Sequence, residues 1–502
     1  MSAILGTIFS SLVHTFSQAG STLTMQVSAV WRSIRKNAFP IHVHELRKFI
    51  PLTSIFFMIS FNYSLLRSVK DVYIMKYASV ASIYYLKLFG VTPSILLLTL
   101  LYSRMSKQVN RDHRFLLTMG YFLVCFGFTY FIMPYLKFVQ LDSLADSLNA
   151  RMPRLEGLWQ TIRYWPASLF YINAEAWGTM ALGVLFWTFV NEITSIEQSK
   201  RFYSFLSIGS GIGLITAGIF LKSLKANLGI ILGIIVTIVG VIAIVYQRFA
   251  ADIRQHPELY QVEVKAKKKK TKLSFTESFK FLMRSQYLAL IATLVICYGV
   301  AVSLFESIWK TQVNGFSDGD TGIMADIYGN QGIASGILSL IFIVFLSGPI
   351  MNRGWRFAAL ITPIITLVAT VIFFAFVYFE ESLRSFTTMG GIAPIVLAVN
   401  LGLMNIVFIK ASKYTLFDPT KERAYVPLDE ESKVRGKAAV DGFGSRVGKS
   451  LGSAIISLIL VPAFGPIENS IYTIFFIILL MLVLWIRSVN KLSELFKTFT
   501  EE

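Results

Sequence analysis

The stretch LGIILGIIVTIVGVIAIVY, Leu228–Tyr246, contains 19 residues and no charged side chain. An apolar run of this length is sufficient for an α-helix to cross the hydrocarbon core of a bilayer. Shortly after it comes KAKKKKTK, Lys265–Lys272, which is too highly charged to enter that core. Because such runs alternate with charged segments along the whole chain, the sequence predicts an all-α polytopic membrane protein.

Similar apolar runs lie on both sides of the basic segment. We expect twelve transmembrane helices, at residues 50–66, 81–103, 115–136, 165–190, 203–221, 228–247, 286–308, 328–347, 357–379, 386–409, 450–463 and 470–486. Six spans, a long basic linker and six further spans are typical of transporters built from two halves. The expected division is an N-terminal segment 1–48, a six-helix half 49–248, a linker 249–284, a second six-helix half 285–488 and a tail 489–502.

The distribution of charge predicts the orientation. The chain has 47 Lys and Arg against 29 Asp and Glu, a net charge of +18. If there are twelve spans, all the basic segments fall on one side of the membrane. These segments are both termini, the linker and the loops after every second span. Basic loops remain in the cytoplasm, so both termini are expected there. The lysine-rich linker could touch anionic lipid headgroups, and we do not expect it to bind nucleic acid.

Several ionisable side chains interrupt the apolar runs, where each costs about 2.5–3.5 kcal/mol to insert. They are Arg67, Lys70, Asp71, Lys87, Glu175, Glu306 and Lys310. Arg67 and Lys70 can share one helical face. Glu306 and Lys310 are spaced to neutralise each other, whereas Glu175 has no local cation and only Asn173 close by. Glu175 therefore forms a structural hydrogen bond, pairs across helices or takes part in transport.

This set of charges predicts an anionic substrate. A cavity lined by Arg67, Lys70, Lys87 and Lys310 would attract a multiply negative solute, because Lys and Arg bind phosphate through charge-assisted hydrogen bonds. The carboxylates would hold these cations when the site is empty, or would carry coupling protons.

The charged segment Lys410–Ser450 has two interpretations. It is either a solvated loop retained in the cytoplasm by its charge, or a cationic surface that binds a polyanion. Its end, GSRVGKS, resembles a P-loop but has three residues between the glycines and no preceding strand, so we do not expect a Walker A site. Gly209, Gly211 and Gly213 are typical of close helix packing. We expect no catalytic centre, metal or cofactor.

Two long stretches carry a resemblance to a known family. They are LFWTFVNEITSIEQSKRFY, Leu185–Tyr203, and KYTLFDPTKERAYVPLDEESKVRGKAAVDGFGSRVGKS, Lys413–Ser450. From Ile41 to the C-terminus the chain resembles the plastid and bacterial ATP/ADP translocase family. The resemblance implies a fold similar to the major facilitator superfamily, alternating access, and either ATP/ADP exchange or proton-coupled nucleotide import.

The resemblance also implies roles for individual residues. Its charged motifs match Lys70 in KD, Glu175 in AEAWG, Glu306 and Lys310 in ESIWK, and Lys437 in GKAAVD. The expected phosphate-binding residues are Arg67, Lys70, Lys310 and Lys437, and the expected coupling or charge-pairing residues are Glu175 and Glu306. Further candidates are Lys87, Asn173, Asn191, Asp441 and Arg446.

One motif departs from the family pattern. ATP/ADP exchangers of this family have RDTKD in the first span, whereas this chain has RSVKD, Arg67–Asp71. The difference favours the alternative of proton-coupled symport or broader nucleotide choice. The expected partners are ATP, ADP or other nucleotides, protons and membrane lipids, and the expected state is a monomer in a bacterial inner membrane. A membrane enzyme would need a nucleophile or NTPase loop, and a sugar facilitator would not need this positive charge.

Overall fold

The computed structural model describes residues 41–225, 227–256, 285–379, 393–429, 432, 436–437, 440 and 444–501. Most of the predicted N-terminal segment, most of the linker, and Asp441 lie outside these residues. Every regular element of the described chain is helical. This agrees with the predicted all-α class.

Ten segments of the described chain are long and apolar enough to cross a membrane. They are Leu46–Tyr77, Val80–Ser106, Arg111–Val139, Trp165–Ile193, Leu228–Gln255, Gln286–Ser317, Trp355–Tyr378, Pro394–Ala424, Arg446–Phe464 and Ile467–Thr498. The predicted span 203–221 lies in α11 (Ile196–Ser223), whose apolar part is Ile208–Ser223. The predicted span 328–347 begins in α16 (Thr321–Ile341) and continues through η6 (Phe342–Leu346) to the first residue of α17 (Ser347–Asn352).

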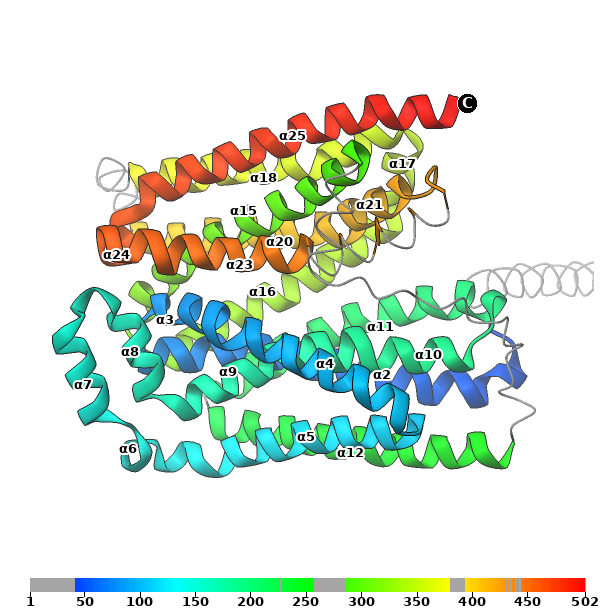
Figure 1. Cartoon of the computed structure of the whole chain (residues 1–502), viewed down its shortest axis with the longest axis horizontal. Helices are drawn as coiled ribbons and strands as arrows, with labels where there is room; N and C mark the ends of the chain where they lie inside the picture. Colours follow the sequence, from blue (N-terminus) through cyan, green and yellow to red (C-terminus); the bar gives the residue numbers. More distant parts are fainter. Residues whose placement is uncertain are drawn as a thin grey trace, which may run out of the picture.

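The helices form two groups that lie side by side (Figure 1). One group contains α2 (Leu46–Tyr77), α5 (Arg111–Ile132), α9 (Trp165–Trp177) and α12 (Leu228–Gln255), with α11. The other contains α15 (Gln286–Ser317), α18 (Trp355–Tyr378), α20 (Pro394–Ser412), α23 (Ser445–Ala454) and α25 (Ile471–Glu501). Figure 1 shows α16 in the region between them.

Among the helices that extend beyond the spans predicted for them, α2 and α15 carry charged residues of interest. The first predicted span ends at residue 66, but α2 continues to Tyr77 because no proline or glycine interrupts the next turns. The span predicted at 286–308 is the start of α15, which continues until Asp318 adopts a left-handed conformation with φ 44°. The charged residues of both segments therefore lie within continuous helices.

Glycines bring α11 and α16 together. A Cβ atom added to Gly218 would lie 2.6 Å from the carbonyl oxygen of Gly329, and one on Gly336 would lie 3.1 Å from the carbonyl oxygen of Gly211. Small residues at such positions let two membrane helices approach backbone to backbone. Gly213 also packs closely, since an added Cβ would lie 3.3 Å from the backbone nitrogen of Phe61, whereas Gly209 has open space.

Buried indoles fix the helices that carry the mid-span charges. Trp177 on α9 donates its Nε1 hydrogen to the carbonyl oxygen of Ile59 on α2 at 3.2 Å. Trp309 on α15 donates to the carbonyl oxygen of Val399 on α20 at 2.9 Å. Because a buried polar group without a partner is costly, these bonds hold each tryptophan in one orientation.

Candidate functional site

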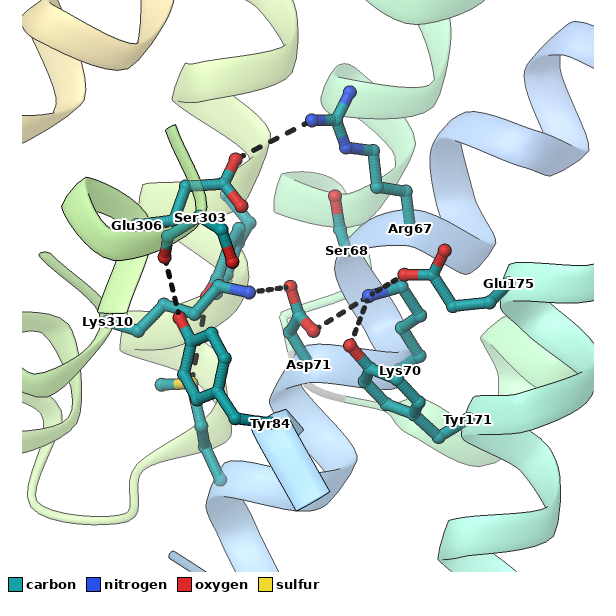
Figure 2. Close-up of polar contacts among 12 residues, drawn as sticks. Arg67, Ser68, Lys70, Asp71, Tyr84, Tyr171, Glu175, Ser303, Glu306 and Lys310 are labelled. Atoms are coloured by element: carbon teal, nitrogen blue, oxygen red, sulfur yellow. Dashed lines mark hydrogen bonds and ion pairs between the residues drawn. The ribbon is translucent and has the colours of Figure 1, made fainter. Parts of the chain in front are cut away.

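Charges on α2 and α15 face one another in complementary order. Arg67 and Asp71 lie one turn apart on α2, and Glu306 and Lys310 lie one turn apart on α15. Lys310 Nζ is 2.9 Å from Asp71 Oδ2, and Arg67 Nη2 is 3.8 Å from Glu306 Oε1 (Figure 2). The structure therefore pairs Glu306 and Lys310 with α2 and not with each other.

Lys70 connects this interface to α9. Its ammonium lies 2.8 Å from Asp71 Oδ1, 3.1 Å from Glu175 Oε1 and 3.2 Å from the hydroxyl oxygen of Tyr171 (Figure 2). An ammonium has three hydrogens to donate, so these three acceptors account for all of them. Tyr171 and Glu175 lie one turn apart on α9, and the Tyr171 ring centroid is 4.2 Å from the same ammonium.

A fourth helix supplies another cation. Lys410 Nζ on α20 is 3.5 Å from Glu306 Oε1, so Glu306 lies between Lys410 and Arg67. We define the ion-pair network as four cations, Arg67, Lys70, Lys310 and Lys410, and three carboxylates, Asp71, Glu175 and Glu306. Within this set the cations are in excess.

The ion-pair network has a buried centre and an accessible rim. The side chains of Lys70, Asp71 and Lys310 are 5%, 7% and 3% exposed, whereas those of Arg67 and Glu175 are 32% and 30% exposed. Charges at the centre are stable only because each is paired. The rim leaves Arg67 and Glu175 accessible to a solute.

Lys87 lies beside the ion-pair network. It belongs to η2 (Leu86–Val91), a π-helical segment, and its ammonium is 5.0 Å from the ring centroid of Tyr84. The Tyr84 hydroxyl donates to the carbonyl oxygen of Ser303, one turn before Glu306, at 3.4 Å. No carboxylate of the described residues forms an ion pair with Lys87.

The remaining candidates do not join the ion-pair network. Asn173 accepts a hydrogen bond from the Tyr121 hydroxyl at 2.7 Å and so pairs with α5. Asn191 accepts one from the hydroxyl of Tyr203. Both amides thus belong to packing contacts within the first group of helices.

Two basic candidates lie elsewhere. Lys437 Nζ is 2.5 Å from Glu422 Oε2, with both side chains roughly half exposed, and Arg446 Nη2 is 3.5 Å from Thr99 Oγ1. Asp441 lies outside the described residues. Ser445 to Ser450 are helical in α23 and form no loop of the kind that wraps a phosphate.

Sequence reasoning did not select Lys410, Asp71 or Tyr171 as site residues. The predicted span ended at residue 409, but α20 continues through η7 (Lys413–Phe417) into α21 (Asp418–Ala424), which places Lys410 within a crossing segment. The spacing of Tyr171 to Glu175, one helical turn, was a usable signal. For Asp71, the signal was its position beside Lys70 in a helix that continues past it.

An all-helical membrane protein with paired charges buried between two groups of helices has the architecture of a secondary transporter. Solved transporters share the fold. A bacterial homologue of the iron transporter ferroportin in an inward-facing state matches with a TM-score of 0.56 and 12% identity, over 90% of this chain and 100% of that one. The nucleoside transporter NupG matches with a TM-score of 0.54 and 12% identity, over 89% and 99%. The chain therefore shares the fold of these two transporters.

The chain belongs to the TLC ATP/ADP transporter family, whose model matches residues 25–496. It is 35% identical to ADP,ATP carrier protein 1 of Chlamydia trachomatis, over 94% of this chain and 93% of that protein. It is 36% identical to ADP,ATP carrier protein 1 of Rickettsia typhi, over 91% and 95%. The chloroplastic ADP,ATP carrier protein 1 of Arabidopsis thaliana is 34% identical, over 92% and 76%. The resemblance stated from the sequence is confirmed.

Proposed function

We propose that this chain transports nucleotides, exchanging ATP for ADP across a membrane by alternating access. The observation that carries the proposal is the ion-pair network, in which four cations meet three carboxylates and the rim is accessible. Its relatives are named ADP,ATP carrier proteins, and the chain spans nearly their whole length. Phosphate groups are the ligands that such a cationic site favours.

In this mechanism the nucleotide phosphate and the protein carboxylates compete for the same cations. With no substrate, Glu175 pairs with Lys70, and Glu306 pairs with Arg67. A nucleotide phosphate displaces these carboxylates because it offers more acceptor oxygens and more negative charge. Release of the nucleotide would leave buried cations unpaired, which is costly, so the ion pairs must form again.

Exchange follows from the position of these pairs. Two of them join α2 to α15, and they hold the two groups of helices in one arrangement when the carrier is empty. A bound nucleotide replaces the pair of Arg67 with Glu306 and lowers the barrier to reorientation. The carrier then returns faster with a second nucleotide than without one, which is the property of an exchanger.

The proposal also assigns a role to each cation. We propose that Arg67, Lys70 and Lys310, the phosphate-binding residues expected from the sequence, contact phosphate together with Lys410. Lys87 forms no ion pair with a carboxylate of the described residues, so no carboxylate has to be displaced before Lys87 contacts phosphate. Lys437, paired with Glu422 at an exposed position, binds the nucleotide outside the ion-pair network.

The proposal includes the membrane arrangement. We infer that α11 and α16 cross the membrane with the ten apolar segments, giving twelve helices in two halves, residues 49–248 and 285–488, joined by the linker 249–284. The grouping of helices in Figure 1 supports this division. Both termini then lie in the cytoplasm, and the protein acts as a monomer in a bacterial inner membrane.

The test is uptake of labelled ATP into proteoliposomes. We expect uptake into vesicles loaded with ADP and little into empty vesicles. Lys70→Ala should reduce uptake at least tenfold, because a hydrogen bond to a charged group contributes about 1.5–3 kcal/mol. The matched control is Lys137→Ala, which removes an exposed lysine outside the ion-pair network.

Two results would each contradict one part of the proposal. One is uptake into empty vesicles that an acidic exterior drives and a protonophore abolishes, which indicates proton-coupled symport. In that case Glu175→Gln or Glu306→Gln should remove the pH dependence. The other is equal uptake by Lys70→Ala and Lys137→Ala, which would exclude phosphate binding at Lys70.

A further inference from the structure

A groove of 1080 Å³ lies outside the ion-pair network, where α2 and α5 end and α12 begins. Its lining combines aromatic rings with a single charged side chain, Lys76. The aromatic residues are Tyr73, Tyr77, Tyr130, Phe131 and Tyr135. This combination is typical of the level at which lipid headgroups meet the hydrocarbon, where tyrosines gather in membrane proteins.

Glycines on α12 leave room for the groove. Gly229 and Gly233 lie one turn apart and both line it. A Cβ atom on Gly233 would come within 3.5 Å of the Tyr130 ring, so a larger side chain there would occupy the space. Apolar residues of the same wall, Ile234 and Ile238, extend from the groove along α12.

The groove opens toward the bilayer. Phe131 is 72% exposed and Ile230 is 49% exposed, although both belong to membrane-crossing segments. Exposed apolar side chains in such segments face lipid. An occupant of this groove must therefore present apolar groups on the side that faces the hydrocarbon of the bilayer.

Lys76 determines the charge of the occupant. Its ammonium lies 5.1 Å from the ring centroid of Tyr77, and no carboxylate of the described residues forms an ion pair with it. A lysine ammonium at a helix end forms charge-assisted hydrogen bonds with a headgroup phosphate. We propose that this groove binds one anionic phospholipid, with its phosphate at Lys76 and an acyl chain along Ile234 and Ile238.

The test is native mass spectrometry of the full chain purified with phosphatidylglycerol or phosphatidylcholine. We expect the wild type to retain one phosphatidylglycerol in preference to phosphatidylcholine. Lys76→Gln should weaken that preference about fivefold, the effect of one basic residue near a membrane surface. Lys137→Gln is the matched control, because Lys137 is exposed and follows α5 but does not line the groove.

A second variant tests the groove itself. Gly233→Leu should abolish retention of both lipids while leaving the melting temperature close to that of the wild type. If it does not fold, Gly229→Leu fills the same groove from a position where an added Cβ meets only Asn227, at 3.6 Å. The proposal would be overturned if Lys76→Gln, or the glycine variant that fills the groove, retained phosphatidylglycerol at the wild-type level. Equal retention of the two lipids by the wild type would also overturn it.

Discussion

The centre of the ion-pair network and the pair of Lys437 with Glu422 use the same chemistry in opposite surroundings. Lys70 and Asp71 lie 2.8 Å apart with side chains 5% and 7% exposed. Lys437 and Glu422 lie 2.5 Å apart with side chains 50% and 44% exposed. The shorter contact is the weaker one, because water screens an exposed pair and also solvates its partners when they separate. Burial, and not distance, decides which pair the protein depends on.

The largest expected effect comes from removing the central carboxylate. Asp71→Ala leaves Lys70 and Lys310 without the anion that lies between them, and loss of one partner from a buried pair costs about 3–5 kcal/mol. We expect a marked decrease in melting temperature and loss of ATP uptake. Adding Lys310→Ala to this variant should restore part of the stability. A melting temperature equal to that of the wild type would contradict this expectation. It would show that water solvates Lys70 and Lys310 when Asp71 is removed, so that the centre is hydrated.

An intermediate effect is expected at the rim. Arg67 and Glu306 lie 3.8 Å apart with side chains 32% and 16% exposed, and Glu306 also pairs with Lys410. A double-mutant cycle with Arg67→Ala and Glu306→Ala should therefore give a coupling free energy of about 1 kcal/mol. The cycle requires the free energy of unfolding of all four proteins. A coupling of about 3–5 kcal/mol, the loss expected on breaking the buried pairs of Asp71, would remove the distinction between rim and centre.

The smallest expected effect on stability is at the surface. Lys437→Ala should change the free energy of unfolding by less than about 1 kcal/mol, as expected for an exposed pair. Glu422→Ala is the control, since it breaks the same pair and keeps the cation. If Lys437→Ala alone raises the KM for ATP, Lys437 binds substrate. Equal KM values in both variants would limit its role to the ion pair.

Much of the site could be predicted from the sequence. Arg67, Lys70, Glu175, Glu306 and Lys310 stand out because ionisable residues in apolar runs are costly and need partners. The sequence does not show where the Asn173 side chain lies, since its position two residues before Glu175 says nothing about which neighbouring helix it faces. The structure places its side chain against Tyr121.

Local sequence determined which segments are helical and apolar, because hydropathy and helix propensity act over a few turns. It also determined that charges would lie within them. Only the tertiary structure decided that Lys310 pairs with Asp71 and not with Glu306, and that Lys410 reaches Glu306 from α20. These partners are far apart in the sequence, and their distance depends on how whole helices pack against each other. Periodicity along one helix carries no information about that packing.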